Sequence, residues 1–248
     1  MYKQMTLEDF VSATSSSKPV PGGGSVAALT AANGASLIAM LCNLTVGKKG
    51  YEDHWDKMKE VADICSKKAQ DFLDVIEKDS KAFNDYMQAL KMPKGDKEEI
   101  MAREMCIASA LYDATFVPLQ LARQAEKLFE YADYAISFGN KMATSDGAIA
   151  VLLLKSAITS ALYNVKINLP SIENVAIKQK IVALMDQVEQ SANQQEKTIL
   201  EKVKMSKFLK WLIATREFLI YFSNTLILRK KRRNRYRKKS WQTADSFF

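Results

Sequence analysis

The sequence predicts an all-α protein, an antiparallel bundle of about six helices that buries one helix of small residues. The 248 residues contain only nine glycines and five prolines, so positions that break a helix are few. Between them, apolar residues recur every three or four positions, the period of an amphipathic helix. Long helices joined by short turns are typical of antiparallel bundles.

Capping residues, prolines and glycines predict where each helix begins and ends. Thr6, three residues before Asp9, caps a short first helix, and a loop follows over 15–24. A turn is expected over 91–96, and Pro118 is expected to bend the helix that contains it. The remaining helices are expected over 25–46, 52–90, 97–131, 145–167 and from 171 to beyond 205.

The helix over 25–46 is rich in Ala, Gly, Ser and Leu, and no charged residue stands between Lys18 and Lys48. Small side chains let neighbouring backbones approach closely, so we expect this helix at the bundle centre or in a subunit interface. Asn33 and Asn43 interrupt its apolar run, which makes a membrane-spanning helix the weaker interpretation.

Two helices carry polar side chains along one face. At about 100° per residue, each set falls within an arc of about 80°. The sets are Ser25, Asn33, Ser36 and Asn43 on one helix, and Asp146, Ser160, Asn164 and Asn168 on or next to the other. Two interpretations remain open: these side chains satisfy one another or hold buried water, or they bind a ligand.

Asp79 is the most informative single residue. It lies within the apolar face of the helix over 52–90, about 60° or less from each residue that defines this face. Those residues are Phe72, Ile76, Phe83, Tyr86 and Leu90. Burial of a carboxylate raises its pKa, which makes Asp79 a candidate acid or base. An internal ion pair or a hydrogen bond between helices is the structural alternative.

Pro21, Gly22, Gly23 and Gly24 precede Ser25 at the start of the small-residue helix. Free N–H groups at a helix start attract anions and carboxylates, and glycines let a ligand approach the backbone. The segment is neither a Walker A loop nor a GxGxxG fingerprint after a strand. A plain junction between loop and helix remains the alternative.

Several classes of function are disfavoured by composition. A single histidine, His54, cannot supply a typical catalytic zinc site, so no metal is expected. His54 is expected to be a surface or packing residue. The chain has three widely spaced cysteines, Cys42, Cys65 and Cys106. An odd number at such spacing favours buried thiols in a reducing compartment over a set of disulfides. We therefore expect a cytoplasmic protein, and no secretory signal begins the chain.

The net charge of +8 belongs to the C-terminus, because nine of the eleven residues over 229–239 are basic. Residues 1–228 hold as many acidic as basic side chains, so nucleic acid is an unlikely partner. We separate a domain over 1–206 from an extension over 207–248, apolar and then basic. The extension is interpreted as a docked last helix or a non-native end. An association with an anionic membrane surface is less favoured.

Several segments together resemble the cyclodeaminase half of formiminotransferase-cyclodeaminase and its free-standing bacterial relatives, which include methenyltetrahydrofolate cyclohydrolase. The resemblance covers about residues 4–206 and is carried by several motifs in order. These are 19–29, 43–51, 79–86 with 91–94, Asn140 with 145–147, and 164–172. It implies an all-α homodimer that acts on a one-carbon-substituted tetrahydrofolate, with no other cofactor, and for the deaminase a role in histidine degradation.

In that family the residue matching Asp79 is taken as catalytic, and a single carboxylate can accept and return the proton that the reaction moves. By hypothesis, the backbone of Gly22, Gly23, Gly24 and Ser25 approaches the ligand. Lys48 or Lys49 would meet the glutamate tail of a folate, which can be polyglutamylated. The side chains expected to bind the pterin or orient Asp79 are Asn33, Asn43, Asp146, Asn164 and Asn168.

Because the chain carries no formiminotransferase segment, channelling of the substrate would need a separate formiminotransferase as partner. The resemblance leaves cyclodeaminase and cyclohydrolase activity equally open. The alternative from a different functional class is a non-catalytic helical interaction module, which could associate with a membrane through its C-terminus. An intact Asp79, the glycine segment and the polar faces favour the enzyme.

Overall fold

The structure is a computed structural model that describes residues 1–204. Within these residues there are helices and the turns between them but no strand, so the all-α prediction is confirmed. The α-helices are α1 (Leu7–Thr14), α2 (Gly23–Asn43), α3 (Trp55–Leu90), α4 (Lys97–Glu126), α5 (Leu128–Phe138), α6 (Thr144–Asn168) and α7 (Val175–Lys204). The apolar and basic extension over 207–248 lies outside the described residues.

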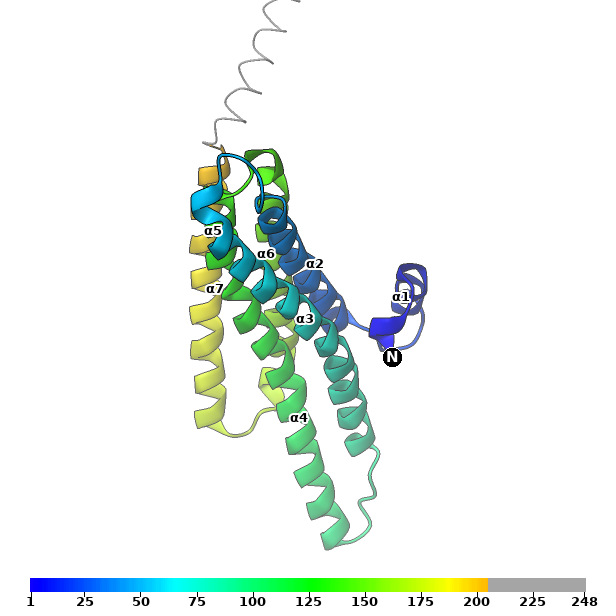
Figure 1. Ribbon diagram of the computed structural model, residues 1–248. Coiled ribbons are helices and arrows are strands. Elements are labelled where there is room, and N and C mark those ends of the chain that lie inside the picture. Colours follow the sequence, from blue (N-terminus) through cyan, green and yellow to red (C-terminus); the bar gives the residue numbers. More distant parts are fainter. Residues whose placement is uncertain (205–248) are drawn as a thin grey trace, which may run out of the picture. The chain divides into compact units, whose positions relative to one another are not determined.

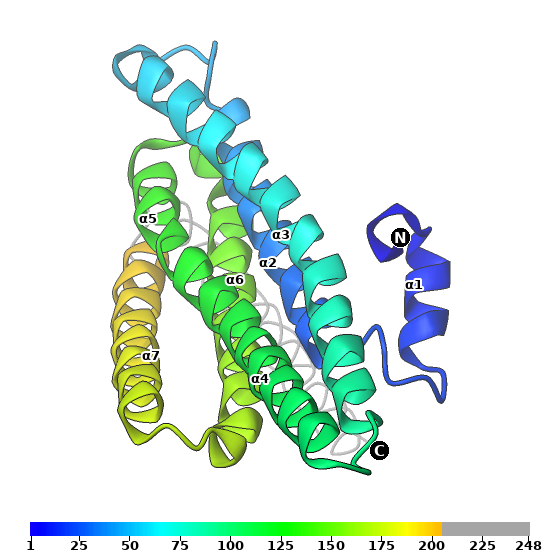
Figure 2. The same ribbon diagram turned by 90° about the horizontal axis from the view of Figure 1, so that it is seen from below.

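Helix α2 forms the centre of the bundle, packed against α3 on one side and α6 on the other (Figures 1 and 2). Its small residues make this packing close: a Cβ added at Gly34 would stand 3.0 Å from Cγ of Leu154 on α6. The prediction of close packing by this helix is therefore confirmed for the face that meets α3 and α6, whereas the face with Val26, Asn33 and Met40 is exposed. By length and composition α2 could also cross a membrane, as could the segments Lys97–Phe138 and Lys141–Ser171.

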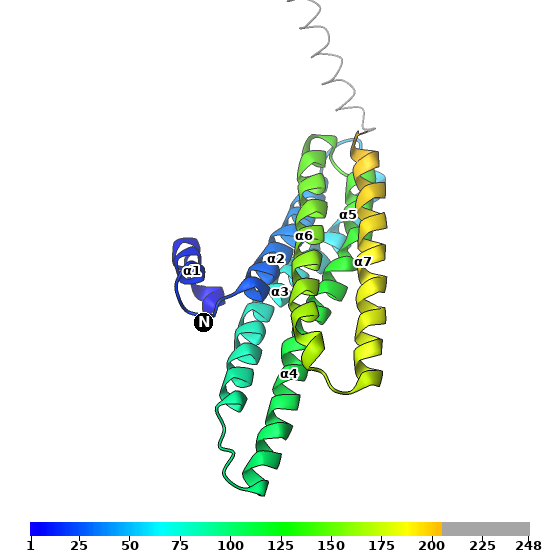
Figure 3. The same ribbon diagram turned by 180° about the vertical axis from the view of Figure 1, so that it is seen from behind.

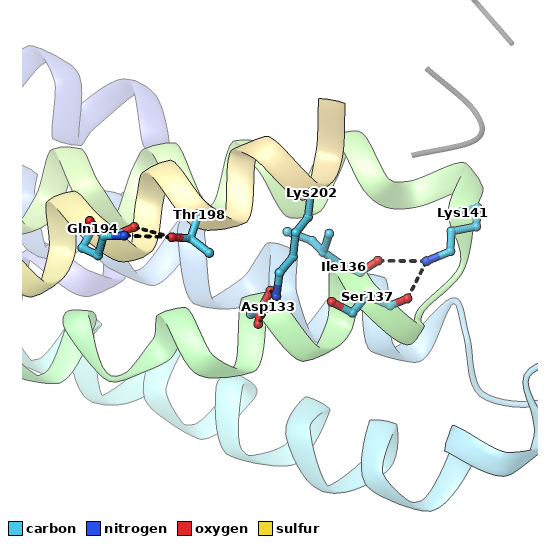
Figure 4. Close-up of polar contacts among 7 residues, drawn as sticks. All are labelled: Asp133, Ile136, Ser137, Lys141, Gln194, Thr198 and Lys202. Atoms are coloured by element: carbon cyan, nitrogen blue, oxygen red, sulfur yellow. Dashed lines mark hydrogen bonds and ion pairs between the residues drawn. The ribbon is translucent and has the colours of Figure 1, made fainter. Parts of the chain in front are cut away.

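Helix α4 packs on α3 and α6, and α7 runs along the bundle beside α4, α5 and α6 (Figure 3). Polar contacts tie α7 to its neighbours. Lys202 binds Asp133 of α5 at 2.6 Å, and Gln195 donates to Glu126 of α4 at 2.7 Å (Figure 4 shows the first of these). These pairs fix the register of α7 along the bundle.

The first helix has the expected cap, because Oγ1 of Thr6 accepts a hydrogen bond from the backbone N–H of Asp9 at 3.1 Å. Helix α1 lies beside the bundle rather than within it (Figures 1 and 3). The short 3-10 helix before it, Tyr2–Gln4, contacts α3, and Lys3 binds Asp74 at 2.5 Å. The N-terminal segment is thereby anchored near the start of α2.

The helix expected over 97–131 is two helices, α4 and α5, and the expectation of one helix is wrong. Helix α4 continues through Pro118, and the chain is interrupted at Lys127 instead. Lys127 keeps right-handed helical dihedral angles, φ −63° and ψ −19°, so neither glycine nor proline is needed there. Helix α5 then ends near Lys141, whose ammonium donates to the carbonyls of Ile136 and Ser137 (Figure 4).

Candidate active site

Asp79 lies on α3 beside the first turn of α2, which brings together two predicted site segments that are distant in sequence. The hydroxyl of Ser25 donates a hydrogen bond to Oδ2 of Asp79 at 2.8 Å. Ser25 is fully buried and Asp79 is half-buried. The helical periodicity that placed Asp79 on the inner face of α3 therefore located it correctly, and its partner is a hydroxyl rather than a cation.

Gly24 permits this approach of α3 to α2. A Cβ added at Gly24 would overlap Oδ1 of Asp79, so the carboxylate fills the space that a side chain would need. The neighbouring Gly23 is different, because a Cβ there would stand 3.9 Å from Asn164, an ordinary contact. Of the three consecutive glycines, Gly24 is thus the one whose missing side chain shapes the site.

The environment of Asp79 favours its protonated form. Burial raises the pKa of Asp79 above the ordinary value of 3.8, and this effect exceeds the lowering by hydrogen bonds from the hydroxyl and the backbone of Ser25. A carboxyl group with a raised pKa is a stronger base than an ordinary aspartate and can both accept and return a proton. The hydrogen bond from the Ser25 hydroxyl also joins α2 to α3, so the carboxylate has a structural role as well.

Ser80, which sequence reasoning missed, belongs to the same cluster. Its Oγ lies 3.3 Å from Oγ of Ser25, and its side chain is buried. The only signal in the sequence was its place next to Asp79 on a helix, because a serine on a buried face is otherwise common. Three oxygen-bearing side chains therefore form a chain from Ser80 through Ser25 to Asp79.

A cavity of about 630 Å³ lies between the loop before α2 and the C-terminal half of α6, and it approaches this cluster through Gly23, which is next in sequence to Gly24; Asp79, Ser25 and Ser80 do not line it. Gly22, Gly23 and Asn164, all predicted as binding residues, line it. The other lining residues are Thr14, Lys18, Pro19, Pro21, Val26, Ala27, Thr30, Ser156, Ser160 and Tyr163. Lys18 and Tyr163 were not predicted, and they supply a cation and an aromatic ring at this cavity.

Three of the other predicted residues, Asn43, Lys48 and Asp146, lie toward the opposite end of α2. Nζ of Lys48 donates to Oδ1 of Asn140 at 3.0 Å, and the backbone N–H of Asn140 donates to Thr45 at 2.9 Å. Asp146 lies in the first turn of α6, beside Asn140 in the sequence. Because α2 has 21 residues, this end lies about 30 Å from the Asp79 end. Within one chain the two groups are separate.

Other site predictions need correction. Asn33, Ser36 and Asn43 are exposed along α2, so the expected polar face on a buried helix is wrong for these three. Ser25 alone of that set is buried, because it meets Asp79. Asn168 donates to the carbonyl of Ala114 at 3.0 Å and so joins α6 to α4 rather than facing Asp79.

The histidine and cysteines behave largely as predicted. His54 is a packing residue: its Nδ1 lies 3.0 Å from the hydroxyl of Tyr134, and its ring stacks on Phe138. Burial raises the pKa of Cys42 and that of Cys65 to about 12. Cys106 is exposed on α4, so the expectation of burial is wrong for this thiol. Within residues 1–204, no three His, Cys, Asp or Glu side chains cluster as metal ligands would.

Comparison with known proteins gives matches over most of the chain. Residues 6–187 match the family described as formiminotransferase-cyclodeaminase. The methenyltetrahydrofolate cyclohydrolase of Methylorubrum extorquens is 34% identical over 199 residues, which cover 80% of this chain and 96% of that protein. The formimidoyltransferase-cyclodeaminase of Gallus gallus is 31% identical over 75% of this chain, which spans only 35% of that longer protein.

A solved structure is similar as well. The crystal structure of formiminotetrahydrofolate cyclodeaminase from Thermotoga maritima superimposes with a TM-score of 0.73 and 27% sequence identity. The match covers 82% of this chain and 99% of that one. The likeness therefore extends across the helical bundle and includes both ends of α2.

Proposed function

Because the chain belongs to the formiminotransferase-cyclodeaminase family, we propose that it is a folate one-carbon enzyme in which Asp79 is the general acid and base. The activity is that of a formimidoyltetrahydrofolate cyclodeaminase or a methenyltetrahydrofolate cyclohydrolase. The observation that carries the proposal is the half-buried carboxylate of Asp79, whose pKa is raised by burial, beside a cavity of about 630 Å³. Asp79 also joins α2 to α3 through Ser25, so it is the family match that disfavours a non-catalytic helical module.

In cyclodeamination, the substrate nitrogen attacks the carbon of the protonated formimino group, and Asp79 accepts the proton that this nitrogen loses. A tetrahedral intermediate forms. Asp79 then returns the proton to the departing amine, ammonia leaves, and the five-membered methenyl ring is closed. A carboxylate also stabilises the cationic carbon electrostatically. A single acid and base in this position typically accelerates such proton transfers by about 10²–10⁴-fold.

In cyclohydrolysis, Asp79 removes a proton from water as the water oxygen attacks the cationic methenyl carbon. The proton is returned to a ring nitrogen as the carbon–nitrogen bond breaks, and the hydroxyl proton is released as the formyl group forms. Both reactions need the same carboxylate with a pKa close to working pH. Each needs only folate as the carrier of the carbon unit, and the absence of any other cofactor stays a prediction.

We further propose that the protein is a homodimer that pairs the α2 and α6 faces of two chains. These faces expose large apolar side chains at spacings of 3, 4, 11 or 14 residues, each of which returns to about the same side of a helix. They are Val26 and Met40 on α2, with Leu44 just after it, and Ile149, Leu152, Tyr163 and Ile167 on α6. Exposed apolar surface of this kind marks an interface, and most small assemblies are two-fold dimers.

A two-fold axis perpendicular to α2 would set two copies of this helix antiparallel. The Asp79 end of one chain would then face the Lys48 and Asn140 end of the other. This arrangement would bring a second cationic group to the Asp79 end, in addition to Lys18 of the cavity. Lys48 would then meet the glutamate tail, as the sequence suggested, while Asp146 and Asn43 come from the same chain as Lys48.

Other predictions are untested by the described residues. A separate formiminotransferase partner and a role in histidine degradation follow from the family alone and stay predictions, as does the cytoplasmic location expected from the cysteines. The same holds for an anionic membrane surface as partner of the extension over 207–248, which lies outside the described residues. Nucleic acid remains disfavoured, because residues 1–228 carry balanced charge.

The experiment that tests the proposal supplies each substrate separately to the purified full chain. Release of ammonia is measured with 5-formiminotetrahydrofolate, and the loss of absorbance is followed with the methenyl compound. We expect turnover in at least one assay, and the faster assay names the reaction. The Asp79→Asn variant serves as the control for contaminating activity. Absence of turnover in both assays, with reduced folate failing to bind in calorimetry, would favour the interaction module.

A further inference from the structure

The hydroxyl groups of Ser25 and Ser80 form a short buried chain that ends on the carboxylate of Asp79. Oγ of Ser25 lies 2.8 Å from Oδ2 of Asp79 and 3.3 Å from Oγ of Ser80. Ser25 and Ser80 are 0% and 3% exposed, so water reaches neither side chain freely. The chain joins α2 to α3 at the point where the acid and base of the proposed reaction sits.

The direction of these hydrogen bonds depends on the proton of Asp79. A serine hydroxyl has one proton to donate and two lone pairs to accept with. While Asp79 is ionised, Ser25 gives its proton to Oδ2, so the 3.3 Å contact requires Ser80 to donate to Ser25. When Oδ2 carries a proton, that group donates to Ser25, whose own proton can turn toward Ser80. Only O–H bonds rotate, and no heavy atom moves.

We propose that Ser80 is a positioning residue that holds the Ser25 hydroxyl on Asp79 in both protonation states, by donating to Ser25 in one state and accepting from it in the other. The inference rests on the proposed role of Asp79. It adds that the site keeps a satisfied hydrogen bond throughout the proton cycle. An unpaired buried hydroxyl in either state would cost free energy at that step.

Ser80 has the place of such a positioning residue and not of a catalytic one. Its hydroxyl reaches the carboxylate through Ser25, because Oγ of Ser80 lies 3.3 Å from Oγ of Ser25 and the hydrogen bond to Oδ2 of Asp79 comes from Ser25. Its loss should therefore act on turnover and leave substrate binding unchanged. A residue that merely supported the bundle would lower activity by an amount that does not depend on Ser25.

The test is a double-mutant cycle with Ser80→Ala, Ser25→Ala and the double variant, since coupled residues give non-additive effects. Alanine is smaller than serine and favours helices, so each variant should fold. We expect Ser80→Ala to lower kcat about five-fold, the rate equivalent of one neutral hydrogen bond, with KM within about two-fold of the wild-type value. In the Ser25→Ala background, Ser80→Ala should cost nothing further.

The matched control is Thr115→Val on α4. Thr115 is 1% exposed, and its hydroxyl is bonded to the carbonyl of Leu111 at 2.7 Å. The Thr115→Val variant should leave kcat unchanged. An equal loss of kcat from Ser80→Ala in both backgrounds, or no loss from Ser80→Ala in an active protein, would overturn the inference alone. A wild-type chain inactive in both folate assays would instead overturn the proposed function.

Discussion

Oδ1 of Asp79 occupies the space that a Cβ at Gly24 would fill. The carboxylate of α3 and the backbone of α2 therefore meet at a position that only glycine allows. This contact explains why Gly24, in the first turn of α2, matters more for the position of Asp79 than Gly23 does. It also places the hydroxyl of Ser25, the next residue, within 2.8 Å of the other carboxylate oxygen.

Gly24→Ala is expected to displace Asp79 and to destabilise the chain. Overpacking at a close contact costs about 1–3 kcal/mol, whereas alanine in a helix recovers at most about 1 kcal/mol relative to glycine. Urea unfolding should show a lower midpoint, and kcat should fall by an order of magnitude or more. Gly23→Ala is the matched control for unfolding, because its Cβ would meet Asn164 only at 3.9 Å. Equal midpoints for the two variants would contradict the steric argument.

Asp79→Asn should abolish turnover while the fold is kept. An amide accepts the hydrogen bond from Ser25 as a carboxylate does, but it cannot take a proton from the reacting nitrogen or from water. We expect kcat to fall by about 10²–10⁴-fold, the usual share of general acid and base catalysis. The control is Asp74→Asn on the same helix, since Asp74 is exposed and bound to Lys3. Undiminished turnover in a folded Asp79→Asn protein would remove Asp79 from the mechanism.

The stability of the chain should depend on pH through Asp79. Because burial raises its pKa, the folded chain binds this proton more readily than the unfolded chain does. The free energy of unfolding therefore increases as pH falls through the raised pKa. Above that pKa, the full free-energy cost of burying the charged carboxylate is present. At pH 7, Asp79→Asn should unfold at an equal or higher urea concentration than the wild type, and the difference should shrink toward pH 4.

Asp74→Asn should behave in the opposite way, which makes it the control for this titration. Lys3 lowers the pKa of Asp74, so the ionised carboxylate stabilises the folded chain and the contribution is lost as pH falls through that lowered pKa. The variant should be no more stable than the wild type at pH 7. An Asp79→Asn protein that is less stable than the wild type at pH 7, and recovers at lower pH, would contradict the direction given above.

Mixing two inactive variants should restore activity if one active site takes residues from two chains. Asp79→Asn impairs one end of the composite site and Lys48→Glu impairs the other. In a mixed dimer one site carries both changes and the other carries neither. After unfolding and refolding together, random pairing should return about a quarter of wild-type activity. Recovery no greater than the sum of the separate variants would place the whole site within one chain.

The sequence predicted the helices and Asp79 well, because both depend on local periodicity. Phe72 and Ile76 repeat at helical spacing, and this spacing alone places Asp79 on the inner face of α3. The division of one expected helix into α4 and α5 at Lys127 was missed, because right-handed helical dihedral angles at the break leave no glycine or proline as a signal.

The partners of Asp79 could not be predicted with equal success. The contact with Ser25 spans 54 positions and is set by how α2 packs on α3. Asn33 and Asn43 lie on the exposed face of α2, the face proposed for the dimer interface. Periodicity in the sequence cannot distinguish this face from one that is buried within a single chain. Ser80 was missed for a related reason, since its role exists only through Ser25.

The backbone amide of Ser25, at the start of α2, helps to lower the pKa of Asp79 and so also gives the site a built-in spectroscopic reporter. Its nitrogen and proton resonances in an NMR spectrum should follow the charge on the carboxylate directly. A titration observed at this one amide would then measure the acid strength of Asp79 in the resting protein without any substrate. Repeating it with a bound folate analogue would show how far the ligand itself changes that acid strength.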